Sequence, residues 1–384
     1  MTTIAENIQT LRSIKSDIKN AIIQKGGSVT DAFGTYAQAI TNLPSGGGGG
    51  TEIEDALITR TLSGTYYNDR ISMVGDYAFA FCNNLKFINL PNCSSVGKGA
   101  FYECTFLLSI DLPNCTYVGS SAVNFCRSIT SIDLPNCSSV GDYAFASCYN
   151  LKFINLPNCS SVGNSVFYSC SVLSSISLPN CTYVGNSAFY CCSALPSISL
   201  PNCSYVGYGA FKSCRSLTSV DLPLCTYVGS AAFAICISLS SIALPNCSYV
   251  GYEAFGNCKA LQSVNLPLCS YVENYAFENC SVLSSIDLPN CSYIGGYVFE
   301  YCSNLISVNL PNCLHIGGYA FKSCTNLTQV YLNSVSSVTT ITYYTFTDCP
   351  NLTSIYVPAS LVDAFKAAEN WPSLSDKIVA YTGA

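Results

Sequence analysis

Cysteine is the residue type with the greatest capacity for chemistry in this sequence. The chain contains 25 cysteines, and 23 of them, from Cys82 to Cys324, recur every 11 residues. Regularly spaced thiols can form disulfides, bind structural zinc, or act as nucleophiles where their pKa is lowered. Alternate cysteines follow different sequences, since Cys93 ends "LPNC" and Cys104 ends "AFYEC". The series therefore consists of two interleaved columns with separate structural positions.

Reduced, buried thiols account for this series better than disulfides or zinc do. The odd number of cysteines, and a chain long enough to bury a core without cross-links, argue against a disulfide framework. Structural zinc favours close pairs such as C-x-x-C, and no such pair recurs here. Cys191 and Cys349 lie outside the regular run, the second displaced by a three-residue insertion in the last repeat. We expect the cysteines to act as small apolar side chains, with no bound metal and no cofactor.

The sequence offers little else for catalysis or metal binding. His315 is the single histidine, and a pair with Cys313 or Cys291 would also need an orienting group and a cleft. Four aspartates share one column of the repeat: Asp111, Asp133, Asp221 and Asp287. Calcium takes about six to eight oxygen ligands, which two neighbouring carboxylates do not supply. We therefore predict solvated aspartates, no catalytic residues and no enzyme activity.

The composition argues against a nucleic acid partner, a secretory leader and a membrane span. Charged residues make up 10% of the chain, the net charge is −6 and the pI is near 4.8. Nucleic acid binding needs clustered Lys and Arg, so nucleic acid is not expected as a partner. Residues 1–30 contain no basic segment followed by an apolar run and a cleavage site, and no apolar span of 18 residues occurs. The sequence predicts neither a secretory leader nor a membrane span.

An internal repeat of 22 residues organises most of the chain. Its unit is V-G-x-x-A-F-x-x-C-x-x-L-x-x-I-x-L-P-N-C-x-x, and units that begin at Val74 and continue to Ile316 and Val338 make 13, with the last irregular. One proline recurs at this spacing without a slip: Pro91, Pro113, Pro135, Pro157, Pro179, Pro201, Pro223, Pro245, Pro267, Pro289 and Pro311. The stretch "LKFINLPNC" follows the leucine-rich repeat signature L-x-x-L-x-L-x-x-N/C, whose period is about 20 to 29 residues. The repeat predicts a solenoid of the α/β repeat class with a parallel β-sheet on one face.

Alternation of side chains gives each repeat an inside and an outside. In "LKFINL", Ile88 and Leu90 point to one side of a short strand and the residues between them point to the other. Proline then ends the strand because it has no N–H to donate. Val96, Ala100 and Phe101 are expected to turn inward on the far side of the coil. One unit buries too little apolar surface to offset its conformational entropy, so the repeats must stack.

The repeat resembles a known family. The stretch "VGDYAFASCYNLKFINLPNC", Val140–Cys159, is similar to the units of BspA-like leucine-rich repeat proteins, "IGxxAFxxCxxLxxIxLP", and the likeness recurs over about 285 residues. The closing segment resembles the ends of such proteins in gut bacteria and their phages. We expect its "SLVDAFKAAENW", Ser360–Trp371, to form a helical cap with Ser360 as the N-cap and Asp363 three residues later. The resemblance implies a surface adhesin or a host-contact protein.

The first 50 residues differ in pattern from the repeats. Apolar residues at intervals of three and four predict an amphipathic helix over residues 3–25, with the stripe Ile4, Ile8, Leu11, Ile14, Ile18 and Ile22. A second short helix is expected at residues 31–40, and the glycine run in 44–50 predicts a flexible linker. Because short helices are marginal alone, we expect docking or oligomerisation; a helical cap on the solenoid is the alternative. This helix and linker resemble N-terminal segments of phage tail-associated proteins.

Tyrosine provides the main candidate for a binding surface. Six consecutive repeats place Tyr immediately before the inward Val or Ile: Tyr183, Tyr205, Tyr227, Tyr249, Tyr271 and Tyr293. A looser second column contains Tyr143, Tyr208, Tyr252, Tyr275, Tyr297 and Tyr319. Exposed Tyr supplies rigid contact area at low entropic cost and suits both protein and sugar ligands. The alternative is that the rings only stack on one another and stiffen the solenoid.

These patterns divide the chain into five parts and favour a binding function. The parts are residues 1–43, a helical docking or oligomerisation segment; 44–50, a glycine-rich linker; 51–73, an N-terminal cap; 74–358, the solenoid; and 359–384, a C-terminal cap. We expect a phage virion protein, a tail fibre or capsid-appended adhesin made in the bacterial cytoplasm, which docks on a virion structural protein through residues 1–43. Its solenoid would contact a host surface protein or glycan. The alternative is a bacterial surface adhesin or an intracellular interaction scaffold.

Overall fold

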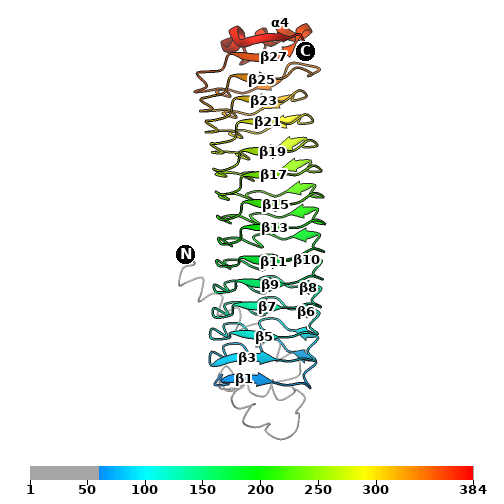
Figure 1. Cartoon of the computed structure of the whole chain (residues 1–384). Coiled ribbons are helices and arrows are strands. Elements are labelled where there is room, and N and C mark those ends of the chain that lie inside the picture. The colour runs from blue at the N-terminus through cyan, green and yellow to red at the C-terminus, as the bar shows by residue number, and fades with distance from the viewer. Residues whose placement is uncertain (1–59, 384) are drawn as a thin grey trace, which may run out of the picture.

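The chain winds into an elongated solenoid whose turns stack along one axis. The computed structural model describes residues 60–383, and Figure 1 shows strand β1 (Gly64–Tyr67) at one end and helix α4 (Val362–Ala367) at the other. Neighbouring strands are parallel and lie 22 residues apart in sequence throughout the regular turns, as in the pairing of Ser161 with Tyr183. The predicted leucine-rich-repeat solenoid is confirmed.

One long sheet follows the solenoid from end to end. It contains 13 strands, one for each predicted repeat, and each strand is two residues long. In each strand the second residue is a buried Val or Ile. The sequence pattern predicted this inward residue, but it did not predict that the pair would form a second sheet. The strands are β2 (Met73–Val74), β4 (Ser95–Val96), β6 (Tyr117–Val118), β8 (Ser139–Val140), β10 (Ser161–Val162), β12 (Tyr183–Val184), β14 (Tyr205–Val206), β16 (Tyr227–Val228), β18 (Tyr249–Val250), β20 (Tyr271–Val272), β22 (Tyr293–Ile294), β24 (His315–Ile316) and β26 (Thr340–Ile341).

The predicted strand of each repeat lies on a second face and is divided among three sheets. Ile88 and Leu90 are buried and Phe87 is exposed, so the predicted alternation is confirmed. The first sheet holds six strands: β1, β3 (Leu85–Asn89), β5 (Ser109–Asp111), β7 (Ser131–Asp133), β9 (Phe153–Asn155) and β11 (Ser175–Ser177). The second holds four: β13 (Ser197–Ser199), β15 (Ser219–Asp221), β17 (Ser241–Ala243) and β19 (Ser263–Asn265). The third holds five: β21 (Ser285–Asp287), β23 (Ser307–Asn309), β25 (Gln329–Tyr331), β27 (Ser354–Pro358) and β28 (Ile378–Tyr381).

A proline explains the first of the two interruptions in this face. Just before the strands, Lys152 N–H donates to Thr130 O at 2.8 Å and Ser174 N–H donates to Lys152 O at 3.0 Å. The next turn has Pro196 in this position, and proline has no N–H to continue the ladder. The ladder resumes where Thr218 N–H donates to Pro196 O at 2.8 Å. Strands β11 and β13 are therefore adjacent turns without a shared sheet.

Stacked phenylalanine rings form the centre of the core. All but one of the regular turns contribute one fully buried Phe, and successive rings lie nearly parallel, as for Phe189 and Phe211 with centroids 5.0 Å apart at 2°. One turn has Val123 in place of Phe, which interrupts the stack between Phe101 and Phe145. An apolar cavity of about 10 Å³ adjoins these three side chains. The smaller side chain thus leaves an unfilled space in an otherwise uniform core.

Filling this cavity is expected to stabilise the protein. In Val123→Phe, the new ring should stack between Phe101 and Phe145, because the other turns accommodate Phe at the same position. Cavity-filling substitutions commonly raise the free energy of unfolding by about 0.5 to 2 kcal/mol. Thermal unfolding of the variant beside the parent chain checks this expectation. A lower melting temperature would show that the turn cannot widen enough for the ring.

The C-terminal segment covers the open end of the core, but its helix is shorter than predicted. After β27, a 3-10 turn η2 (Ala359–Leu361) leads into α4, and η3 (Pro372–Lys377) precedes β28. Ser360 is not the N-cap: it lies inside η2, and Leu361 flanks the helix without a side-chain cap bond. The helix ends at Ala367 because Ala368 is extended, which turns Trp371 back into the core. Trp371 Nε1–H donates to Thr339 O at 2.9 Å.

The last repeat begins three residues later than predicted. Ile341, and not Val338, pairs with Ile316 and fills the inward position, because the insertion precedes the strand. Cys349 rejoins its column beyond the insertion, where its Sγ–H donates to Phe321 O at 2.9 Å. The predicted N-terminal helices, linker and isoleucine stripe lie outside the described residues, as does the part of the 51–73 cap before residue 60.

Candidate binding surface

The two cysteine columns occupy different corners of the coil. In the column after "AF", each thiol from Cys104 onward donates to a carbonyl of an earlier turn, as Cys148 Sγ–H does to Val123 O at 3.1 Å. In the column after "LPN", each thiol donates to the backbone two residues ahead, as Cys115 Sγ–H does to Tyr117 O at 3.2 Å. All 25 cysteines are free thiols; the 23 of the regular series are buried, and Cys191 and Cys349 are half-buried. The predicted buried position of the regular series is confirmed.

Burial makes these thiols poor nucleophiles. It raises the pKa of Cys170 to about 12 and that of Cys115 to about 11, in each case chiefly by removing the thiolate from water. The thiol is therefore the form present at neutral pH, whereas nucleophilic attack and metal binding need the thiolate. Among residues 60–383 no group of three or more His, Cys, Asp or Glu side chains is placed to hold a metal ion.

A thiol count checks the redox state. Denatured, unreduced protein is expected to react with a thiol reagent at close to 25 sites, and native protein at very few, because both columns are inaccessible. A count near zero or one in the denatured protein would contradict the free-thiol structure.

His315 belongs to the tyrosine column and not to a catalytic pair. Its ring stacks on Tyr293 at 4.7 Å, and its Nδ1 lies 3.0 Å from Thr340 Oγ1. Cys313 Sγ–H donates to the His315 carbonyl oxygen at 3.1 Å, so the two side chains do not form the pair considered above. Burial lowers the pKa of His315, which keeps the imidazole neutral at pH 7.

The six predicted tyrosines come together in one ladder along the 13-stranded sheet. Strand pairing places each ring on the next, and the pairs lie 4.3 to 5.8 Å apart at 2° to 12°. Because the rings are nearly parallel and in contact, each face inside the ladder is covered by a neighbour. The ladder therefore presents ring edges and hydroxyl groups to solvent. We call Tyr183, Tyr205, Tyr227, Tyr249, Tyr271, Tyr293 and His315 the aromatic ladder.

Two hydroxyl groups of the aromatic ladder, those of Tyr249 and Tyr271, have strongly raised pKa values. Partial burial and the nearby Glu273 raise the pKa of Tyr249 to about 12, and Tyr249 Oη–H donates to Glu273 Oε1 at 3.2 Å. Partial burial and hydrogen bonding with Tyr293 raise the pKa of Tyr271 to about 12 as well. At these two positions the ladder therefore combines ring edges with hydroxyl groups that stay uncharged at neutral pH.

The looser second tyrosine column is only partly continuous. Tyr275, Tyr297 and Tyr319 stack in sequence at 4.7 and 4.9 Å, and Tyr344 extends the stack at 5.3 Å. Tyr252 is tilted by 56° against Tyr275, because it stands one position earlier in its repeat. This column therefore forms a second, shorter ring stack near the C-terminal end.

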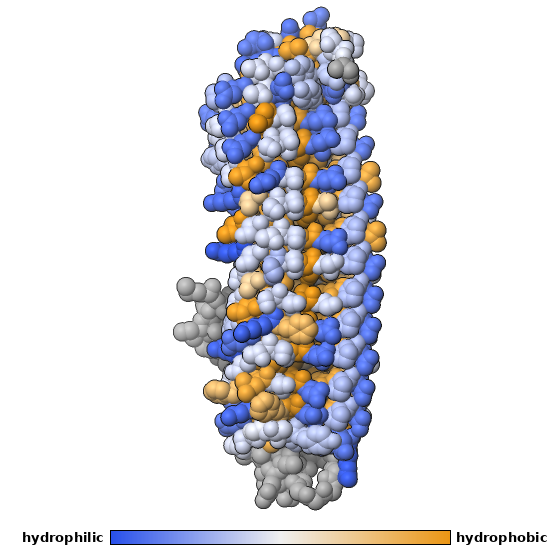
Figure 2. All heavy atoms as spheres, viewed as in Figure 1, coloured by the Kyte–Doolittle hydropathy of each residue, from blue (hydrophilic) through white to orange (hydrophobic). Residues whose placement is uncertain are grey.

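The face of the odd-numbered strands is weakly polar. Its aspartates bond to side chains of adjacent turns: Asn155 Nδ2–H donates to Asp133 Oδ1 at 3.0 Å, and Ser199 Oγ–H donates to Asp221 Oδ2 at 2.9 Å. Figure 2 shows pale and blue surface on this side of the molecule, crossed by a lengthwise orange stripe and by separate orange and tan patches to its left. A shallow hollow lies beside Ala243, whose small side chain leaves space between its neighbours.

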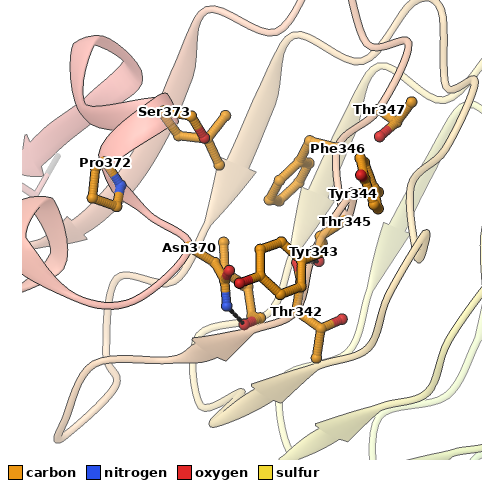
Figure 3. Close-up of a pocket in the computed structure, with 11 residues that line it drawn as sticks. Thr342, Tyr343, Tyr344, Thr345, Phe346, Thr347, Asn370, Pro372 and Ser373 are labelled. Atoms are coloured by element: carbon orange, nitrogen blue, oxygen red, sulfur yellow. Dashed lines mark hydrogen bonds between the residues drawn. The ribbon is translucent and has the colours of Figure 1, made fainter.

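A second hollow, also of about 450 Å³, lies at the C-terminal end of the solenoid. It lies between the last turn of the coil and η3, and Figure 3 shows Tyr343, Phe346, Asn370 and Ser373 around it. This hollow was not predicted from the sequence. The signal available was the three-residue insertion, which marks the turn where the repeat becomes irregular.

Comparison with known proteins agrees with this geometry. A model of the BspA type leucine rich repeat region matches residues 59–173, 160–282 and 248–368. The chain belongs to the BspA-type leucine-rich repeat family. No curated protein sequence matches the chain.

Solved structures with the same fold include a leucine-rich repeat protein from Bacteroides ovatus. It is 25% identical, with a TM-score of 0.57 over 81% of this BspA-type chain and 88% of the other. A leucine rich cell surface protein from Faecalibacterium prausnitzii is 21% identical, with a TM-score of 0.42 over 82% and 87% of the two chains. The pneumococcal vaccine antigen PcpA is 15% identical, with a TM-score of 0.46 over 83% of each chain.

The BspA-type solenoid brings the six predicted tyrosines together. The six tyrosines form one ladder, whereas the stripe from Ile4 to Ile22 lies outside the described residues. Within residues 60–383, no helix has both the length and the apolar character needed to cross a membrane.

Proposed function

We propose that this protein is a non-enzymatic binding protein that recognises a protein or glycan on a cell surface. The observation that carries the proposal is the aromatic ladder, a rigid and uncharged row of tyrosine edges and hydroxyl groups fixed by strand pairing. Such a row offers contact area without the entropic cost of ordering side chains on binding. Its covered ring faces favour edge and hydroxyl contacts over stacking of a ligand on the rings.

The chemistry of the described residues supports a binding role over catalysis. The buried thiols have raised pKa values, and His315 is neutral and stacked. A catalytic site needs an activated nucleophile or a positioned acid and base in a cleft. The thiols, which could act as nucleophiles, instead fill the core, and His315, which could act as an acid or a base, extends the aromatic ladder.

Two triple variants separate recognition from stiffening. In one, Tyr227, Tyr249 and Tyr271 are replaced by Ser; in the other, the same three residues are replaced by Phe. The readouts are binding of labelled protein to intact bacterial cells and mucin-coated plates, and the melting temperature. We expect the Ser variant to lose both binding and stability. The Phe variant should keep its melting temperature, because the rings still stack, and lose at least about tenfold in binding, because hydroxyl groups are absent.

Unchanged binding by the Ser variant, together with a lowered melting temperature, would assign the ladder to stiffening alone. If the Phe variant binds as the parent chain does and the Ser variant does not, the ring edges carry recognition and the hydroxyl groups do not.

In its more specific form, the proposal places the protein in a phage particle. The order of an amphipathic N-terminal segment, a glycine-rich linker and a repeat domain supports attachment through residues 1–43 to a virion structural protein. The solenoid would then contact the host surface, with homo-oligomerisation through the isoleucine stripe. The alternative is a bacterial surface adhesin or an intracellular scaffold. Mass spectrometry of purified virions decides between them, since absence of the protein from particles would remove the phage form.

A further inference from the structure

The C-terminal hollow exposes part of the core that every other turn keeps covered. Phe346 is the last ring of the central stack and lies 5.2 Å from Phe321 at 2°. Phe321 is fully buried, but Phe346 is partly exposed, because the cap covers the core around Phe365 and Trp371 and leaves the other side open. In Figure 3 Phe346 stands on one side of the hollow, opposite Ser373. Phe346, a ring of the core stack, thus forms one aromatic wall of the hollow.

Tyr343 supplies a second aromatic wall with an accessible ring. It is 69% exposed, and its ring contact within residues 60–383 is a tilted one with Tyr344, at 6.2 Å and 46°. Tyr344, by contrast, lies against Tyr319 at 16° and ends the second tyrosine stack. Tyr343 therefore differs from the aromatic ladder: its ring face is available to a ligand and is not covered by a parallel neighbour.

Polar but uncharged groups line the rest of the hollow. Asn370 adopts the left-handed conformation, with φ of 67°, and its Nδ2–H donates to Ile341 O at 3.0 Å, which fixes the orientation of the amide. Thr342 and Ser373 contribute hydroxyl groups at the edge, and Pro372 and Leu374 contribute apolar surface. Among residues 60–383, no Asp, Glu, Lys, Arg or His lines the hollow. This chemistry suits a neutral ligand with one apolar face and a perimeter of hydroxyl groups.

We infer that this hollow binds a neutral sugar ring, such as a hexose or an N-acetylhexosamine residue of a glycan. The ring's apolar face would lie against Tyr343 or Phe346, and its hydroxyl groups would bond to Asn370, Thr342 and Ser373. A volume of about 450 Å³ lies within the range of small-molecule sites. A peptide that adds a strand is less well matched: β26 is the last strand of the 13-stranded sheet, but its Ile341 O already accepts a hydrogen bond from Asn370 Nδ2–H. The inference rests on the proposed binding function and names a ligand class for a separate site.

The single tryptophan of the chain reports on this site. Trp371 stands between Asn370 and Pro372, which both line the hollow, and its indole packs at 5.0 Å against Phe365. Full-length protein is titrated with neutral mono- and disaccharides, namely glucose, galactose, N-acetylglucosamine, lactose and chitobiose, while Trp emission is followed. Saturation-transfer NMR identifies which sugar protons contact the protein. We expect a saturable change at millimolar sugar for at least one of them, and none for the acidic sugars glucuronate and sialic acid.

Variants at Tyr343 test whether the sugar response comes from this hollow. Tyr343→Ala should weaken sugar binding at least about tenfold, and Tyr343→Phe should retain it within a few-fold, because the ring face carries the contact. Tyr301→Ala is the matched control, since Tyr301 is 47% exposed but belongs to a different turn. Melting temperatures confirm that each variant is folded.

Several results would overturn the sugar site. These are no response to any neutral sugar, an equal response in Tyr343→Ala, a preference for the acidic sugars, or a response only to a neutral tetrapeptide probe. If cell binding by the parent chain persists in any of these cases, the proposed function stands and the sugar site alone fails. If cell binding is absent while sugar binds, the proposed function fails and the site remains.

Discussion

Raising the pH from 8 to about 10.5 is expected to unfold this solenoid in one steep transition. All 23 regularly spaced thiols have pKa values raised above the ordinary value of 9.0, with burial as the largest cause in each. In the folded chain these thiols stay protonated, whereas in the unfolded chain they ionise near pH 9. Alkaline pH therefore favours the unfolded state.

The sign and size of this effect follow from proton linkage. Below pH 9 both states hold the thiol protons, and the full stability is present. Above pH 9 the unfolded state binds fewer protons than the folded state, so the free energy of unfolding falls as pH rises toward the folded-state values, about 12 for Cys258 and Cys302. Each thiol contributes up to about 1.4 kcal/mol per pH unit. Summed over the two columns, this exceeds the net stability of a typical domain, about 5 to 15 kcal/mol, within roughly one pH unit.

Circular dichroism and thiolate absorbance, recorded on the same samples as pH is raised, test this prediction. The two signals should change together, because thiolate can form only as the coil opens. Tyrosinate absorbs at longer wavelength and is followed separately. Urea-denatured protein serves as the control, and its thiols should titrate near their ordinary pKa. A gradual rise in thiolate absorbance around pH 9, with native circular dichroism unchanged, would contradict the burial of the columns.

The periodic part of the fold could be predicted from the sequence. The repeat gives the spacing between equivalent strands, and the alternation within it shows which side chains point inward. Ile88, Val96 and Phe101 were placed inside by alternation alone, and the structure buries all three. The second sheet was not predicted, because a two-residue strand such as Ser95–Val96 is too short for any alternation to show. Left-handed residues such as Tyr275 and Asn279, with φ of 61° and 57°, also gave no signal, since few of these positions hold glycine.

The aromatic ladder and the C-terminal hollow also differ in how far the sequence could predict them. The aromatic ladder was predictable because Tyr recurs at one position, and strand pairing then forces the rings together. Stacking of the rings on one another was one of the two sequence-based alternatives, and the structure shows nearly parallel rings with covered faces. The C-terminal hollow depends on contacts between segments that share no pattern: an insertion before Ile341, a helix that ends at Ala367, and the turn that follows it. Only the folded arrangement of these non-repeating parts creates the site.

Replacing Phe189 by Ala is expected to lower the free energy of unfolding by about 3 to 5 kcal/mol. The Phe189 ring is fully buried between Phe167 at 5.1 Å and Phe211 at 5.0 Å. The cavity cannot collapse easily, because the long sheet fixes the distance between turns on one face. On the other face, Pro196 has already removed the hydrogen bond that would join β11 to β13. This turn therefore depends on ring packing more than its neighbours do.

Loss of that packing should also change how the chain unfolds. In a repeat protein each turn is stabilised mainly by its nearest neighbours, so a weakened interface can separate two cooperative units. We expect denaturant unfolding of Phe189→Ala to split into two transitions and amide exchange to increase around residues 175–199. Phe233→Ala is the matched control: it removes an equally buried ring where β15, β17 and β19 share one sheet, and it should lower stability while keeping one transition. Two transitions in both variants, or one in both, would show that the interrupted sheet does not weaken coupling between turns.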